Sequence, residues 1–249
     1  MQRFADNARV DPGSDTMKVL TLALTLVLAA ASTALACPDS FRRLEILSPA
    51  HSPMLATADG TAVAWSTAAV DPSRTLVTGR LVVREGTRDR TIFESRTSRR
   101  GRVLGPDGRE LDANYDVFCA VDWSSDGRYL IVQEVIGTWP SNAFDDLYWV
   151  WDRTRERRAM LDVAPLLHAV AIHWKARGAP VVTGEYTVEP VGWHAGEPDR
   201  VVFAASTTFT TDDRFLGLWS VGLRGEKPRL LSETQKRGII RPWGRDRPT

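Results

Sequence analysis

Hydrophobic and polar positions alternate in short runs that are separated by turn residues. The clearest run, 128–134, follows the turn pair Asp126-Gly127, and a second alternating run lies at 147–151. Such β-branched and aromatic runs, bounded by Asp-Gly or Pro-Asp turns, are typical of hairpin strands. The best helical stretch is 163–175, with a proline near its start, but its β-branched residues leave that assignment open.

The same order of runs recurs along the chain. Three pairs of corresponding residues lie at similar spacings: Trp123 and Trp193 (70 residues), Trp151 and Trp219 (68), and Asp59 and Asp126 (67). Three spacings near one period indicate an internal repeat. The repeats cover about 44–95, 118–165 and 189–233 of one domain, 37–233, which a basic tail follows at 234–249.

The segment 123–131 (WSSDGRYLI), followed by 145–152 (DDLYWVWD), resembles a blade of TolB-like or prolyl-oligopeptidase-type (WD40-like) β-propellers. Residues 120–161 match that pattern well, 191–231 moderately, with His194 at the usual serine position, and 56–93 weakly. The resemblance implies an all-β fold of three propeller-like four-stranded repeats, a small, partial or irregular propeller. A shared fold says little about function.

The period near 68 residues exceeds the 40–50 that a blade usually needs, so 96–117 and 166–188 are extra segments. They are either hairpins on one rim or degraded blades. Three blades do not close a ring. Closure by the extra segments, pairing of two chains as a homodimer, and an open stack of blades all stay open at this point.

Export is predicted from the N-terminal segment. Met17-Lys18 precedes an apolar run, 19–31, which is too short to span a membrane comfortably, and small residues stand at Ala34 and Ala36. This pattern is typical of a secretory signal peptide cleaved after Ala36, with 1–16 as an upstream extension. The mature protein is then periplasmic or secreted, without a transmembrane segment.

Cleavage after Ala36 leaves Cys37 as the first residue, which is where a bacterial lipoprotein carries its lipid. Ala34 and Leu35 reverse the residue order that lipidation prefers, so soluble export is favoured. The alternative for Cys37 is a disulfide with Cys119, the other cysteine of the chain, which export permits. The two fates exclude each other because both consume the Cys37 sulfur.

Composition excludes several function classes. The formal net charge is +1 and charged residues make up 25%, so no strong global field attracts nucleic acid or an anionic membrane. Two cysteines cannot build a disulfide-dense scaffold or a four-thiolate zinc site. The four histidines have no chelating spacing, and we expect no metal and no cofactor.

Candidate binding residues lie in two hairpin loops, 135–146 and 206–214, and in the tail. They are Trp139, Asp145, Asp146, Asp212, Asp213 and Trp243. Paired carboxylates on one rim can hold calcium or act as acid and base, whereas aspartates in hairpin turns often only cap local amides. The repeated tryptophans are explained by packing between blades. The basic clusters 96–102, 153–158 and 236–247 suit either an anionic ligand or solvated turns.

No G-x-S-x-G elbow, Walker loop or G-x-G-x-x-G motif is present, so no catalytic residues are assigned. The sequence therefore predicts an exported, non-catalytic binding or scaffolding protein of the bacterial envelope, with a propeller rim that binds a protein or a glycan. Two alternatives stay open: a hydrolase or lyase that uses rim carboxylates, and an inhibitor of an envelope enzyme. The hydrolase or lyase predicts a strongly perturbed aspartate in a central pocket.

Overall fold

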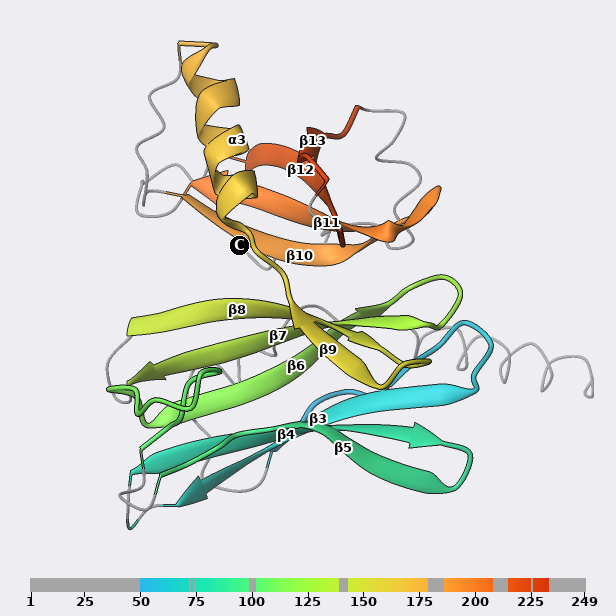
Figure 1. Ribbon diagram of the computed structural model, residues 1–249, viewed down its shortest axis with the longest axis vertical. Helices are drawn as coiled ribbons and strands as arrows, with labels where there is room; N and C mark the ends of the chain where they lie inside the picture. Colours follow the sequence, from blue (N-terminus) through green and yellow to red (C-terminus); the bar gives the residue numbers. More distant parts are fainter. Residues whose placement is uncertain are drawn as a thin grey trace, which may run out of the picture. The chain divides into compact units, whose positions relative to one another are not determined.

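The strands form three consecutive antiparallel meanders (Figure 1). The computed structural model describes residues 50–71, 73, 75–98, 102–138, 143–178, 186–207, 215–224 and 226–232. Blade 1 consists of β1 (Ala50–His51), β2 (Leu55–Ala56), β3 (Ala62–Asp71), β4 (Leu76–Glu85) and β5 (Arg88–Glu94). Blade 2 consists of β6 (Tyr115–Trp123), β7 (Tyr129–Thr138), β8 (Ala143–Asp152) and β9 (Arg157–Met160).

Blade 3 consists of β10 (Tyr186–His194), β11 (Glu197–Thr207), β12 (Phe215–Gly222) and β13 (Arg229–Leu230), paired in that order. The helix α3 (Ala164–Lys175) connects β9 to β10. The prediction of an all-β fold built from three propeller-like four-stranded repeats is confirmed. Among the described residues, no helix is long and apolar enough to cross a membrane.

The two extra segments do not form blades in the part of the chain that the structure describes. The first contributes only isolated bridges, Thr97 with Val103 and Leu104 with Glu110, and lies against the ends of β4 and β7. The second begins with α3, whose Leu166 and Val170 are buried against blade 3. Both therefore serve as covers for the blades, and the helical reading of 163–175 is correct.

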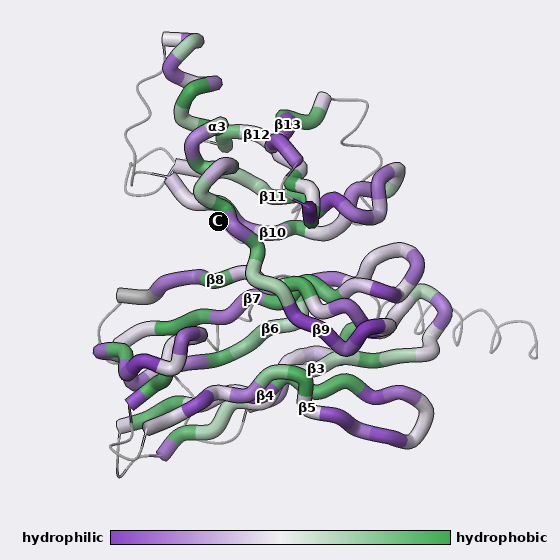
Figure 2. Tube along the Cα trace, in the orientation of Figure 1, coloured by the Kyte–Doolittle hydropathy of each residue, from purple (hydrophilic) through white to green (hydrophobic). Residues whose placement is uncertain are grey.

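Apolar side chains fill the two junctions between neighbouring blades, where the strands alternate in hydropathy (Figure 2). Leu81 and Phe93 of blade 1 pack against Leu130 and Val132 of blade 2. Ile131, which lies between those two residues, faces the other way and packs against Phe203 of blade 3. Because successive strand residues face opposite sides, blade 2 buries both of its faces.

The turn between the first two strands of each blade explains the repeated motif. Asp126 accepts hydrogen bonds from the Ser124 hydroxyl (2.6 Å) and the Arg128 amide (3.1 Å). Asp59 accepts the same pair of bonds in blade 1, from the Thr57 hydroxyl and the Thr61 amide. The glycine that follows each aspartate has a φ near +68°, which favours glycine (Gly60 +69°, Gly127 +67°).

The repeated tryptophan fastens each blade to the one before it. The Trp123 indole donates a hydrogen bond to the Leu55 carbonyl oxygen of blade 1 (3.0 Å). The Trp193 indole makes the corresponding bond to the Asp122 carbonyl oxygen of blade 2 (3.2 Å). Trp123 is 4% exposed and Trp193 is completely buried, so their role is packing, as predicted.

The other tryptophan pair was aligned wrongly by the sequence pattern. Trp193 pairs with Val201 as Trp123 pairs with Leu130, which makes Val201 equivalent to Leu130. Counting two positions further along each strand places Trp219 opposite Phe203 and Trp149 opposite Val132. Trp219 therefore corresponds to Trp149, 70 residues away, and not to Trp151.

Candidate functional site

The rim at the ends of β7 and β8 carries a hollow of about 370 Å³, which we call the rim hollow. Its described lining consists of Leu111, Asp112, Ala113, Ile136, Gly137, Thr138 and Asp145. Four of these residues belong to the predicted loop region 135–146, whereas 111–113 come from the first extra segment. The volume falls within the usual range of small-ligand and side-chain pockets.

The floor of the rim hollow is apolar and its edge is polar. Ala113 and Ile136 are buried there together with Val103, and the partly buried Leu111 packs against them. The Thr138 hydroxyl donates to the Asp112 carbonyl oxygen (2.8 Å), which ties the extra segment to β7. The Asp112 carboxylate is almost fully exposed and pairs with Arg102 at 3.1 Å.

The two aspartates predicted in this rim lie inside β8 and not before it. Asp145 faces the rim hollow, opposite Ile136 in the strand register, whereas Asp146 accepts a hydrogen bond from the Gln133 amide (2.8 Å). Both are exposed. Since adjacent strand residues point to opposite faces, the two carboxylates do not converge on one ligand.

Most of the other predicted site residues lie outside the described part of the chain. They are Trp139, Asp212, Asp213, Trp243 and Cys37. Cys119 is described and lies buried in β6. The disulfide between Cys37 and Cys119 and the binding roles of the loop residues stay predictions. Within the described residues, no group of three or more His, Cys, Asp or Glu side chains is arranged to hold a metal ion.

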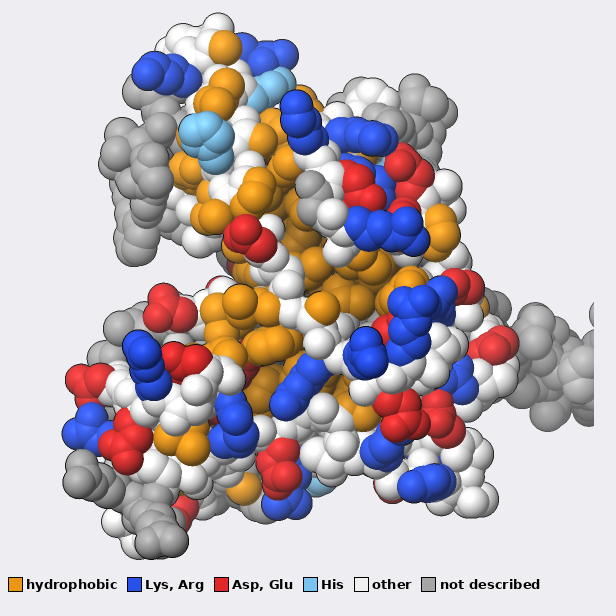
Figure 3. Space-filling view, in the orientation of Figure 1, with side chains coloured by type: hydrophobic (Ala, Val, Ile, Leu, Met, Phe, Trp, Pro, Cys, Tyr) orange, Lys and Arg blue, Asp and Glu red, His pale blue; other side chains and the backbone are white. Residues whose placement is uncertain are grey.

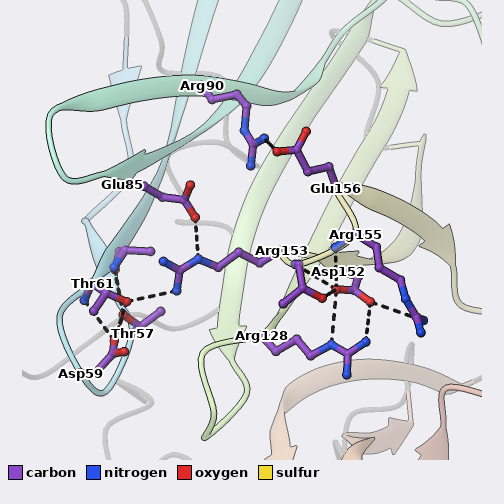
Figure 4. Close-up of polar contacts among 12 residues, drawn as sticks. Thr57, Asp59, Thr61, Glu85, Arg90, Arg128, Asp152, Arg153, Arg155 and Glu156 are labelled. Carbon is purple, nitrogen blue, oxygen red and sulfur yellow. Dashed lines mark hydrogen bonds and ion pairs between the residues drawn. The ribbon is translucent and has the colours of Figure 1, made fainter.

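The opposite rim is a network of ion pairs in which the basic cluster 153–158 takes part (Figure 4). Arg153 donates to Glu85 of blade 1 (2.5 Å) and to the Thr61 hydroxyl (3.1 Å). Arg90 of blade 1 pairs in turn with Glu156 of blade 2. These pairs connect two blades, so the cluster is not a free anion site.

Asp152 neutralises two further arginines of this rim. It pairs with Arg128 at 3.0 Å and with Arg155 at 3.8 Å. Partial burial opposes ionisation of Asp152, but the hydrogen bonds from Arg128 and Thr154 outweigh it and hold the pKa of this carboxyl well below its usual range. The Arg158 guanidinium lies over the Phe93 ring.

Two carboxyl groups that the sequence analysis did not select are buried where blade 1 meets blade 2. Asp116 of β6 is 1% exposed and Glu134 of β7 is 5% exposed. Burial and the neighbouring Glu134 charge raise the pKa of Asp116 to about 8, and burial also raises the pKa of Glu134. Their only sequence signal was a charged residue in each of two otherwise apolar strands.

A second hollow, of about 230 Å³, lies between the outer strands of blades 2 and 3, where apolar side chains reach the surface (Figure 3). Met160, Leu161 and Pro165 line one side, and Val221, Leu223 and Pro228 line the other. Asp162 caps the start of α3, since it accepts a hydrogen bond from the Ala164 amide (3.0 Å). Local bonds occupy this edge, so the rim hollow is the better candidate site.

No protein-family model and no curated protein sequence matches the chain. Among solved structures, AtxE2 isopeptidase is similar at a TM-score of 0.45 and 13% identity, over 85% of this chain. The chain spans only 34% of the length of that protein. The β-propeller domain of the trilobed protease from Pyrococcus furiosus aligns at a TM-score of 0.30 and 10% identity, over 74% of this chain and 57% of that domain.

Acylaminoacyl peptidase from Pyrococcus horikoshii aligns at a TM-score of 0.29 and 12% identity, over 77% of this chain and 33% of that protein. These solved structures include the prolyl-oligopeptidase type of propeller but do not point to TolB in particular. At such values the similarity does not transfer an activity. The propeller-like description therefore depends on the strand order of this chain, which forms three four-stranded meanders.

Proposed function

We propose that the protein is an exported, non-catalytic binding module of the bacterial envelope, and that the rim hollow receives part of a protein or a glycan. The observation that carries the proposal is the hollow itself, with its apolar floor at Ile136 and Ala113 and its polar edge at Asp112, Thr138 and Asp145. A concave apolar surface with a few polar groups at its edge is the usual form of a binding site.

The geometry gives less support to the hydrolase or lyase alternative. That alternative predicts a perturbed aspartate in a pocket, and Asp116 is strongly perturbed. Its side chain is 1% exposed, however, and it lies in the packed junction between two blades, where a substrate cannot reach it in this structure. An accessible catalytic carboxyl must also touch its substrate.

The test is a pull-down of the tagged mature chain, 37–249, from a crosslinked envelope fraction of its own host, with a glycan panel run in parallel. Wild type is compared with Asp112→Lys and Asp145→Lys, which reverse charges at the hollow edge. Asp89→Lys is the matched control, because Asp89 is an exposed carboxylate on blade 1 that pairs with Arg84.

We expect one protein or glycan to be retained by wild type and by Asp89→Lys and lost by both rim variants. Equal retention by the rim variants would place the binding site elsewhere on the protein. If no protein and no glycan is retained by any sample, the binding-module proposal is wrong. In that case a reaction or a small ligand becomes the better hypothesis, and metal content is measured next.

A further inference from the structure

Asp116 and Glu134 lie side by side on the face of blade 2 that packs against blade 1. Asp116 stands opposite Ile136 in the register of β6 and β7, and Glu134 is two residues from Ile136 on the same strand face. The Asp116 carboxyl is hydrogen-bonded to Glu134, with Asp116 carrying the proton. Two buried carboxyl groups in contact cannot both ionise without a large electrostatic cost.

The surroundings of the pair hold one proton in place. The Trp149 indole donates to Glu134 Oε2 (2.6 Å), which favours an ionised Glu134. The Oδ1 atom of Asp116 has no hydrogen-bond partner within the described structure. Loss of the shared proton would therefore leave a second buried charge with little to compensate it.

The charged groups that face the pair are few. Arg96, which follows β5, and Arg158 of β9 act on it from a distance, and both favour ionisation. Arg96 donates its own hydrogen bonds to the carbonyl oxygens of Gly105 and Pro106, and Arg158 lies over the Phe93 ring. In the described residues, β4 and β8 contribute no further ionisable side chain to the causes of these shifts.

The pair is located where the backbones of blades 1 and 2 meet. The strands β4 and β6 are joined in parallel at two positions, Val77 with Tyr115 and Thr78 with Asp116. The Ser95 hydroxyl, at the end of β5, donates to the Asp116 carbonyl oxygen (2.6 Å). A second charge at Asp116 would thus act directly on the contact between the two blades.

We propose that Asp116 and Glu134 form a proton-controlled latch, in which one shared proton keeps blades 1 and 2 joined and loss of that proton loosens their junction. The latch is independent of the binding role proposed above. It nevertheless lies next to the rim hollow, because Ile136 belongs both to the hollow lining and to the strand position opposite Asp116.

The direction of the pH effect follows from linkage. In the unfolded chain both carboxyl groups ionise near their ordinary values, about pH 4, whereas the folded pair keeps one proton up to about pH 8. The folded state therefore binds one proton more than the unfolded state between these limits. The contribution of the pair to stability is complete below about pH 4 and is lost as the pH rises to about 8.

The experiment measures urea unfolding of the mature chain between pH 5 and pH 9, for wild type, Asp116→Asn and Glu134→Gln. The control is Asp89→Asn, which removes an exposed carboxylate of blade 1. We expect the urea midpoint of wild type and control to fall as the pH rises, and the decline to shrink in both latch variants. Infrared spectra at neutral pH should show the carbonyl band of a protonated carboxyl in wild type only.

Hydrogen exchange locates the effect. The Val77 amide, which bonds the Asn114 carbonyl oxygen across the junction, should lose protection between pH 6 and pH 9 after correction for intrinsic rates, while β11 and β12 keep theirs. A midpoint in wild type that does not depend on pH, or an equal decline in the latch variants, would overturn the latch. So would protection lost equally in all three blades, which would describe global unfolding.

Discussion

Replacement of Trp193 by phenylalanine tests whether the repeated indole fastens neighbouring blades. Trp193 is completely buried, stacks on Tyr129 with ring centroids 5.8 Å apart, and donates to the Asp122 carbonyl oxygen of blade 2. Phenylalanine keeps an aromatic ring but removes the donor. The loss of one hydrogen bond costs about 1 kcal/mol, and the carbonyl oxygen left behind is desolvated. The smaller ring leaves a cavity that costs about 1 kcal/mol more.

We therefore expect Trp193→Phe to lower the free energy of unfolding by about 2 kcal/mol, and Trp193→Ala by about 3–5 kcal/mol. Trp65→Phe is the matched control, because Trp65 is only partly buried on the outer face of blade 1, beneath the Arg84 guanidinium. It should cost at most about 0.5–1 kcal/mol, the value of an exposed cation–π contact. The assay is urea unfolding followed by circular dichroism. A loss in Trp193→Phe no larger than that in Trp65→Phe would refute the fastening role.

Three further substitutions probe the blades and their turns. Gly79→Ala should cost about 1–3 kcal/mol in urea unfolding, because the added Cβ would stand 2.7 Å from the Val117 Cα at the junction. Asp126→Ala removes the acceptor of two turn hydrogen bonds and should cost about 1–2 kcal/mol by the same assay. Hydrogen bonds from Thr57 and Thr61 lower the pKa of Asp59 to about 2, so its contribution to stability is present above about pH 4 and is lost as the pH falls toward 2. Asp59→Asn should therefore flatten the acid limb of the stability profile and leave the alkaline limb unchanged.

The sequence carried enough information to identify the repeated blade because its signals are local. A serine or threonine, an aspartate and a glycine in a five-residue turn fix the backbone through bonds within that turn, as at Ser124 and Asp126. The register of Trp219 was misjudged because β10 and β11 pair irregularly near Trp193 and His194. That irregularity separates two spacings which a simple period treats as one.

The parts of the site that were missed depend on contacts that are distant in sequence. Leu111 and Ala113 form the floor of the rim hollow only because an extra segment folds back over β7. Asp116 and Glu134 look like solvent-facing charges in alternating strands. They are buried because blade 2 is covered on both faces, which the alternation within one strand cannot reveal.

The junction positions also indicate which face of blade 1 ends the stack. Strand register makes Ala56 equivalent to Trp123 and Arg84 equivalent to Trp151, since Val63 of blade 1 and Leu130 of blade 2 pair with these residues in turn. Ala56 has no indole to donate to a preceding blade, and the Arg84 side chain is 46% exposed and paired with Asp89. Terminal units of stacked repeats need a polar outer face, because an apolar one would bind further copies. Blade 1 thus has the residues of an end blade, and another blade could not join it through the contact that fastens blades 2 and 3.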